Sequence, residues 1–141
     1  MPSPRSSGRL RALRCAAWFC VVLITCLSLV PHDLEIRTQA PAGIEHAVAY
    51  GGTAALMILA YPSWPVWTIV GSLAVYSGLM ELLQNFSPGR HPGLDGMLWS
   101  SAGAIVGGLA IAFLRGRMQG RDEAASGVEG HGTRLRGTSR R

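Results

Sequence analysis

The sequence predicts an all-α membrane protein, built as a bundle of four transmembrane helices with both chain termini in the cytoplasm. The chain has 141 residues, of which 48% are hydrophobic and only 15% are charged. A soluble domain of this size carries about 25% charged residues. The few charges gather at the chain ends and in short gaps, which leaves four apolar runs of membrane-spanning length.

The first run is predicted to form a helix over about residues 11–30, after a basic cytoplasmic segment at residues 1–14. No charge interrupts the chain from Cys15 to Val30. A cleaved secretory signal is disfavoured, because the candidate cleavage residue Ala42 lies too far beyond Val30. The run is therefore interpreted as an uncleaved membrane span.

The second and third runs are predicted to form helices over about residues 44–61 and 66–86. Pro62 and Pro65 leave only a very short connection between them. Two helices joined by so short a connection form an antiparallel hairpin.

Two pairs of polar residues stand at the same end of this hairpin. His46 and Tyr50, near the start of the second helix, share one helical face. Glu81 and Gln84, near the end of the third helix, also share a face. A charge inside a membrane span is costly unless it is paired or functional. Glu81 is therefore the residue that most needs an explanation.

A loop with two Pro-Gly turns follows the third run. The turns Pro88-Gly89 and Pro92-Gly93 suit type II geometry, since only the second central residue needs a positive φ. Arg90 directly follows the first turn, so it is expected to lie close to the end of the third helix. Asp95 stands just before the last apolar run, where it can cap the start of a helix.

The fourth run is predicted to form a helix over about residues 96–114. Gly103 and Gly107 make a GxxxG pattern, which predicts close packing against another helix of the bundle. Residues 115–141 contain seven Arg and six Gly and few large apolar residues. They are predicted to be a disordered basic tail that lies on anionic lipid headgroups.

The arginines near the span ends orient the bundle. Those in residues 1–14 and 115–121 outnumber Arg37 and Arg90 on the other side, so both termini are predicted to be cytoplasmic. Polar residues from three helices and a loop then fall in one layer at the extracytoplasmic edge of the membrane. This candidate polar site consists of His46, Tyr50, Glu81, Gln84, Arg90 and Asp95.

The polar residues and the glycines of the fourth run resemble the VanZ-like family of bacterial membrane proteins, over about residues 44–114. The family pattern is a His-x-x-x-Tyr at one helix start, a Glu-x-x-Gln at the end of another, a Pro-Gly-Arg turn, and an Asp followed by a Gly-rich helix. The matching stretches here are Glu45-His46-Ala47-Val48-Ala49-Tyr50, Glu81-Leu82-Leu83-Gln84, Pro88-Gly89-Arg90, Asp95, and Gly103 with Gly107.

The chain also departs from the family pattern. Ala42 and Gly43 stand where many members have an Asp-Lys pair, and Asp95 follows Arg90 by five residues where six is usual. The family is named for a protein associated with low-level resistance to the glycopeptide teicoplanin. The resemblance therefore implies a protein of the bacterial cytoplasmic membrane that acts in the cell envelope.

Each candidate residue also has a purely structural interpretation. Glu81 can pair with Arg90 and hold the outer loop against the bundle. His46 can be an interface histidine bonded to a backbone carbonyl. Tyr50 can be a packing residue with a satisfied hydroxyl, and Asp95 can be a helix cap alone.

Three classes of function remain open. The first is a binding module that recognises a lipid-linked cell-wall component or a glycopeptide antibiotic, with Arg90 holding a phosphate or carboxylate oriented by Glu81 and Gln84. The second is a membrane enzyme acting on a lipid-linked or phosphate-bearing substrate, with Glu81 or His46 as general base. The third is a small transporter, which is disfavoured because no charge lines the inner halves of the spans.

No cofactor is expected. Cys15, Cys20 and Cys26 all lie in the first apolar run and are interpreted as buried small hydrophobic residues. A metal site is disfavoured, because no cluster of Cys or His accompanies them. The expected partners are membrane lipids, and no nucleic acid is expected.

Overall fold

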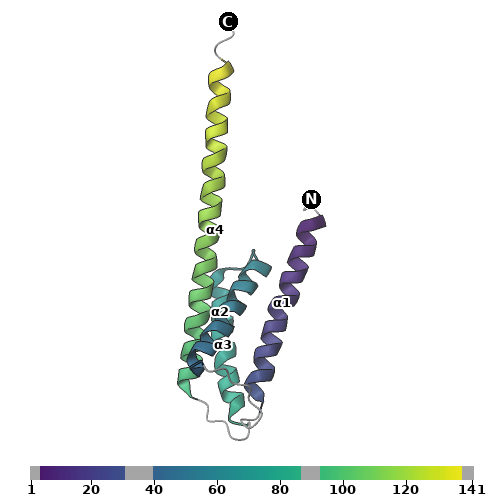
Figure 1. Cartoon of the computed structure of the whole chain (residues 1–141), viewed down its shortest axis with the longest axis vertical. Helices are drawn as coiled ribbons and strands as arrows, with labels where there is room; N and C mark the ends of the chain where they lie inside the picture. Colours follow the sequence, from purple (N-terminus) through teal and green to yellow (C-terminus); the bar gives the residue numbers. More distant parts are fainter. Residues whose placement is uncertain (1–3, 31–39, 87–92, 138–141) are drawn as a thin grey trace. The chain divides into compact units, whose positions relative to one another are not determined.

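Helices form along these apolar runs because a backbone inside a bilayer finds hydrogen-bond partners only within its own segment. The computed structural model describes residues 4–30, 40–86 and 93–137, and nearly all of them are helical. The all-α class is therefore confirmed. In chain order the helices are α1 (Pro4–Leu29), α2 (Ala42–Ala60), α3 (Val66–Gln84) and α4 (Leu94–Gly137) (Figure 1).

Each of these helices contains a stretch that is long and apolar enough to cross a membrane. Within the described ranges the candidate spans are Ser7–Leu29, Ala42–Ala60, Val66–Gln84 and Leu94–Met118. Many of their large apolar side chains are exposed, Phe19 and Val75 among them. Such an outer surface is stable when lipid, rather than water, surrounds the bundle. The chain is therefore a multi-pass membrane protein whose surface contacts lipid.

The first helix differs from its prediction in two ways. α1 begins at Pro4, so most of the basic N-terminal segment is helical. Proline suits the first helical position, and Arg, Leu and Ala all favour helix. Cys15 and Cys26 are exposed and Cys20 is half-buried, in place of the expected burial. The reason is that α1 packs against the bundle along one side, while its other side faces lipid.

The last helix is much longer than its prediction. α4 continues to Gly137, where the sequence predicts a disordered tail from residue 115. Residues 115–125 are rich in Arg, Met, Gln, Glu and Ala, whose high helix propensity outweighs the two glycines among them. Residues 112–141 form a unit of their own, separate from the unit of residues 1–111.

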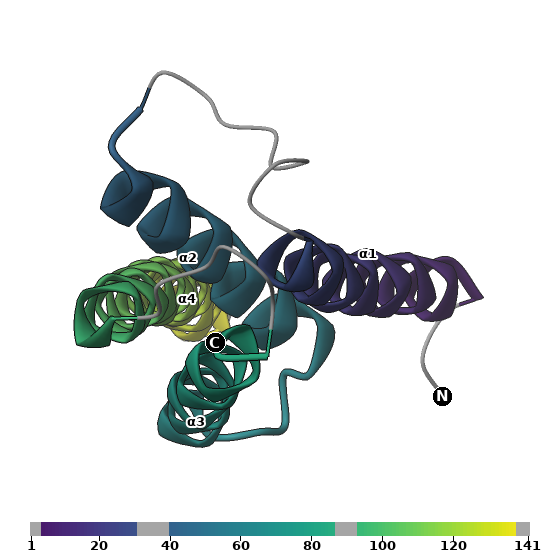
Figure 2. The ribbon, with the colours of Figure 1, turned by 90° about the horizontal axis from the view of Figure 1, so that it is seen from below.

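Contacts between the helices show that neighbours in the chain run in opposite directions. A Cβ atom on Gly108 of α4 would lie 3.5 Å from both Ile58, near the end of α2, and Val66, at the start of α3, so these two helix ends are close together. Near the middle of both helices, the ring of Tyr50 lies 6.1 Å from the ring of Tyr76. At the end of α2, the indole of Trp18 on α1 donates a hydrogen bond of 2.9 Å to the hydroxyl of Tyr61. Figure 2 shows α2 between α1 and α4, with α3 alongside. The hairpin of α2 and α3 is therefore antiparallel, as predicted.

α2 and α4 run in the same direction and meet backbone to backbone. Gly103 lies on the backbone of Ala47, and Gly107 lies one turn further on, against Gly51. A Cβ atom on either glycine of α4 would collide with a carbonyl oxygen of α2. Small residues at four-residue spacing on both helices allow this close approach. The GxxxG pattern therefore lies at a contact inside the bundle.

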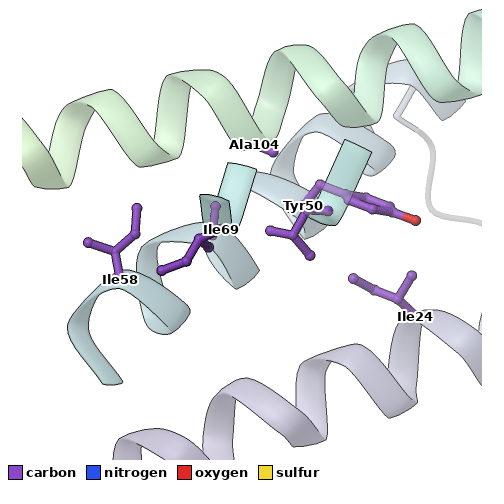
Figure 3. Packing of buried hydrophobic residues seen from close by; sticks show 7 residues of the cluster. Ile24, Tyr50, Ile58, Ile69 and Ala104 are labelled. Atoms are coloured by element: carbon purple, nitrogen blue, oxygen red, sulfur yellow. The ribbon is translucent and has the colours of Figure 1, made fainter. Parts of the chain in front are cut away.

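The apolar core is centred on α2 and receives side chains from every helix. Figure 3 shows how the side chains of α2 lie between α1 and α4. Its buried members are Ile24, Tyr50, Ala54, Ile58, Ile69, Leu73 and Ala104.

Candidate functional site

α3 carries a stripe of polar residues near its end. Ser77, Glu81 and Gln84 follow one another at helical spacing, so they project from one side of the helix. Ser77 and Gln84 are buried, and Glu81 is half-buried. Polar side chains inside a membrane bundle need protein partners, because hydrocarbon offers none. For Ser77 and Glu81, these partners come from α2 and α4.

Tyr50 of α2 brings its hydroxyl to this stripe. It is 2% exposed, and its hydroxyl is within hydrogen-bonding reach of the side chains of Ser77 on α3 and Ser100 on α4. Ser100 is also buried. We call these three residues the hydroxyl cluster. Hydrogen bonds between membrane helices contribute about 0.6 kcal/mol each on average, so the cluster adds modestly to the packing of α2, α3 and α4.

A second set of hydroxyl groups extends the polar contacts to α1. The hydroxyl of Tyr76 lies 2.7 Å from Oγ1 of Thr25. The carbonyl oxygen of Val21 can accept from either hydroxyl group, at 3.1 Å from Tyr76 and 2.9 Å from Thr25, and the two hydroxyl protons are shared among these three contacts. All four helices are therefore tied together at about the level of the hydroxyl cluster.

The carboxylate of Glu81 lies at the start of α4. Its Oε2 atom accepts a hydrogen bond of 3.2 Å from the backbone N–H of Gly93, the residue before the helix. Its Oε1 atom lies against Gly96, where a Cβ atom would collide with it. The first N–H groups of a helix lack partners within the helix and carry partial positive charge. Glu81, on α3, accepts a hydrogen bond from one N–H at the start of α4. This contact explains how a negative charge is tolerated at the end of a span.

His46 stands level with Glu81 in the bundle. α2 and α3 are antiparallel, and Tyr50 lies opposite Ser77. His46 is one turn before Tyr50, and Glu81 is one turn after Ser77, so both fall at the same height along the helices. His46 is half-buried there.

The other two candidate residues are less well placed. Asp95 lies inside the first turn of α4, because the helix begins at Leu94. Its exposed carboxylate folds back towards Gly93, where it favours the helix start through the helix dipole. Arg90 lies outside the described residues, so its pairing with Glu81 stays a prediction.

A groove of about 630 Å³ opens between α3 and α4 beside Glu81. Apolar side chains of both helices make most of its walls, and Glu81 and Asn85 are polar members of its lining. The candidate polar site predicted from the sequence also includes His46, Tyr50 and Gln84. In the described part of the chain, none of these three lines the groove, and Tyr50 and Gln84 are buried within the bundle.

Sequence reasoning did not identify the residues that hold Glu81 and Tyr50 in place. The candidate site predicted from the sequence includes neither Ser77 nor Ser100, and it does not connect Gly96 with Glu81. A signal was nevertheless present. Ser77 is one turn before Glu81, and Gly96 is one turn before Ser100, so the partners share helical faces with predicted residues.

In the part of the chain that the structure describes, no group of three His, Cys, Asp or Glu side chains is placed to hold a metal ion.

No protein-family model, curated protein or solved structure matches this chain. Its class therefore follows from fold and site alone. It is a multi-pass helical membrane protein with a carboxylate and a hydroxyl cluster at the contact of α2, α3 and α4.

Proposed function

We propose that the chain is a VanZ-like protein of the bacterial cytoplasmic membrane, whose polar site recognises a lipid-linked cell-envelope component or a glycopeptide antibiotic. The observation that carries the proposal is the placement of Glu81. Its carboxylate is held at the end of a span, by the N–H of Gly93, one turn from the hydroxyl cluster. A polar site at this depth meets the headgroup layer, where a lipid-linked ligand presents its polar part.

The direction of the chain supports an outward-facing site. The arginines concentrate in residues 1–14 and 115–121, around the start of the first span and the end of the fourth, whereas Glu81 stands near the end of the third span. Segments rich in arginine stay in the cytoplasm, so the Glu81 end belongs outside. Arg90, close to this end in sequence, supplies a guanidinium suited to phosphate or carboxylate.

Labelling of single cysteines tests this orientation. In a background without Cys15, Cys20 and Cys26, His91→Cys should react with a membrane-impermeant maleimide in intact cells, and Gln119→Cys should react only after lysis. The physical reason is the positive-inside distribution of arginine. The opposite pattern would place the polar site in the cytoplasm and refute its role in the cell envelope.

Glu81→Gln tests recognition itself. The amide keeps the shape and part of the hydrogen bonding of the carboxylate but removes its charge. Cells that express the chain should be less susceptible to teicoplanin than cells without it. We expect the variant to retain part of that difference, since a binding site keeps its other contacts. Glu45→Gln, which removes another carboxylate at the same end, is the matched control and should behave as the unmodified chain does.

Three other results are possible in this experiment. Complete loss in Glu81→Gln, with normal expression, would indicate that Glu81 acts as a general base in a membrane enzyme. A chain that leaves teicoplanin susceptibility unchanged, and that co-purifies with no lipid-linked cell-wall precursor, would contradict the proposed function. Equal loss in Glu45→Gln would show that the effect is not specific to the site.

A further inference from the structure

The groove beside Glu81 opens on the outer surface of the bundle. Val75 and Leu79 of α3 and Leu94 of α4 line it. Val75 is 76% exposed and Leu94 is 77% exposed, so in a bilayer these side chains meet acyl chains. Gly78 also lines the groove, and a Cβ atom there would lie 3.3 Å from the sulfur of Met97 on α4, so a larger residue at this position would enter the space between the two helices.

A carboxylate stands among these apolar walls. Glu81 lines the groove and lies in the last turn of α3, so its charge is at the depth of the lipid headgroups. One oxygen of Glu81 accepts the N–H of Gly93. A carboxylate offers about four acceptor positions, so Glu81 retains capacity for a donor that arrives along the groove. Asp95, exposed in the first turn of α4, adds a second negative charge nearby.

We propose that this groove binds an aminophospholipid of the phosphatidylethanolamine type. One acyl chain lies between α3 and α4, and the primary ammonium of the headgroup donates to Glu81. Charge complementarity supports this occupant, because an ammonium brings both a positive charge and three N–H donors to a carboxylate. The proposal deepens the proposed function, since Glu81 belongs to the same site, and it identifies the lipid face of α3 and α4 as the route of entry.

The volume of the groove is compatible with this occupant. About 630 Å³ lies within the range of about 300–1,000 Å³ typical of small-molecule sites. The apolar walls match an acyl chain, and the polar end matches a small headgroup that donates hydrogen bonds. A trimethylated headgroup has no N–H to donate to Glu81, whereas a primary ammonium has three.

A methylation series tests the proposal on the unmodified full-length chain. The chain is reconstituted in nanodiscs that contain phosphatidylethanolamine, its mono- or dimethyl derivative, or phosphatidylcholine, all with the same acyl chains. Lipid retained on the released protein is then counted by native mass spectrometry. Retention should fall stepwise, about tenfold from the first lipid to the last, which corresponds to about 1.4 kcal/mol. Equal retention across the series, or a preference for phosphatidylglycerol, would overturn the proposal.

Matched variants locate the site. Glu81→Gln should lose the preference for the primary amine, whereas Glu45→Gln should keep it. Gly78→Leu fills the groove and should reduce retention of all four lipids, whereas Gly71→Leu, at an open position on the same helix, should not. If Glu81→Gln fails to fold, the methylation series still decides. Two chains found together without lipid would show that a second copy covers the groove, and would refute the proposal.

The assay separates this proposal from the proposed function. Nanodiscs expose both ends of the bundle and contain no antibiotic and no cell-wall component. A clear amine preference without any effect on teicoplanin susceptibility would refute only the function. An effect on susceptibility without amine preference would refute only the lipid site.

Discussion

Replacing Gly103 with alanine is expected to lower the stability of the bundle. The added Cβ atom would collide with the carbonyl oxygen of Ala47, which belongs to the backbone of α2 and has no alternative rotamer. α2 and α4 must therefore move apart. Overpacking of this kind costs about 1–3 kcal/mol. Gly107→Ala should behave in the same way, because its Cβ atom would meet the carbonyl oxygen of Gly51.

Adjacent glycines of α2 provide the control. A Cβ atom on Gly51 would lie 2.9 Å from the carbonyl oxygen of Gly103, whereas one on Gly52 would have nothing within 4 Å. Gly51→Ala should therefore destabilise, and Gly52→Ala should be neutral or slightly stabilising, since alanine favours helix. Thermal unfolding in detergent measures both. If Gly103→Ala unfolds at the same temperature as Gly52→Ala, the helices are not in backbone contact.

Loss of this contact should also disturb the site. Ser100 is one turn before Gly103 on α4, and it reaches Tyr50 across the same pair of helices. A shift of α4 away from α2 weakens the hydroxyl cluster and moves the start of α4 relative to Glu81. We therefore expect Gly103→Ala to reduce the amine preference of the groove together with stability.

The spans could be predicted from the sequence because a bilayer allows few alternatives. Apolar runs of about 20 residues between charges must be helical there. The predicted hairpin at Pro62 and Pro65 follows from a connection too short for any other arrangement. Helix ends were predicted less well, since α1 and α4 extend into polar sequence whose helix propensity the hydropathy pattern does not report.

The partners within the site could not be predicted from the sequence. That Tyr50 meets Ser77 and Ser100 depends on how far each helix rotates about its axis, which single-residue patterns do not specify. The orientation of α1 had the same uncertainty, so Cys15 and Cys26 face lipid rather than the core. The groove depends on the separation of α3 and α4, and this separation follows from packing along their whole length.

Gly96→Ala is expected to displace the carboxylate of Glu81 without changing its chemistry. The new Cβ atom would collide with Oε1 and would lie 3.1 Å from the carboxyl carbon. The side chain of Glu81 is flexible, so it should turn away and release the N–H of Gly93. A hydrogen bond to a charged group contributes about 1.5–3 kcal/mol. Hydrogen–deuterium exchange at Gly93 should therefore become about 10–100-fold faster, while Gly71→Ala should leave it unchanged.

A double mutant shows whether this effect acts through Glu81. In a chain that already carries Glu81→Ala, the methyl group at position 96 has no carboxylate to displace, so Gly96→Ala should add nothing to the exchange rate at Gly93. Residues in direct contact show such non-additive effects, whereas independent sites add. If the two changes add, the alanine acts on α4 by itself and Glu81 does not hold the helix start. If they do not add, the same carboxylate of Glu81 both accepts the N–H of Gly93 before α4 and forms the acidic end of the groove. Any ligand that binds this carboxylate must then also alter the start of α4.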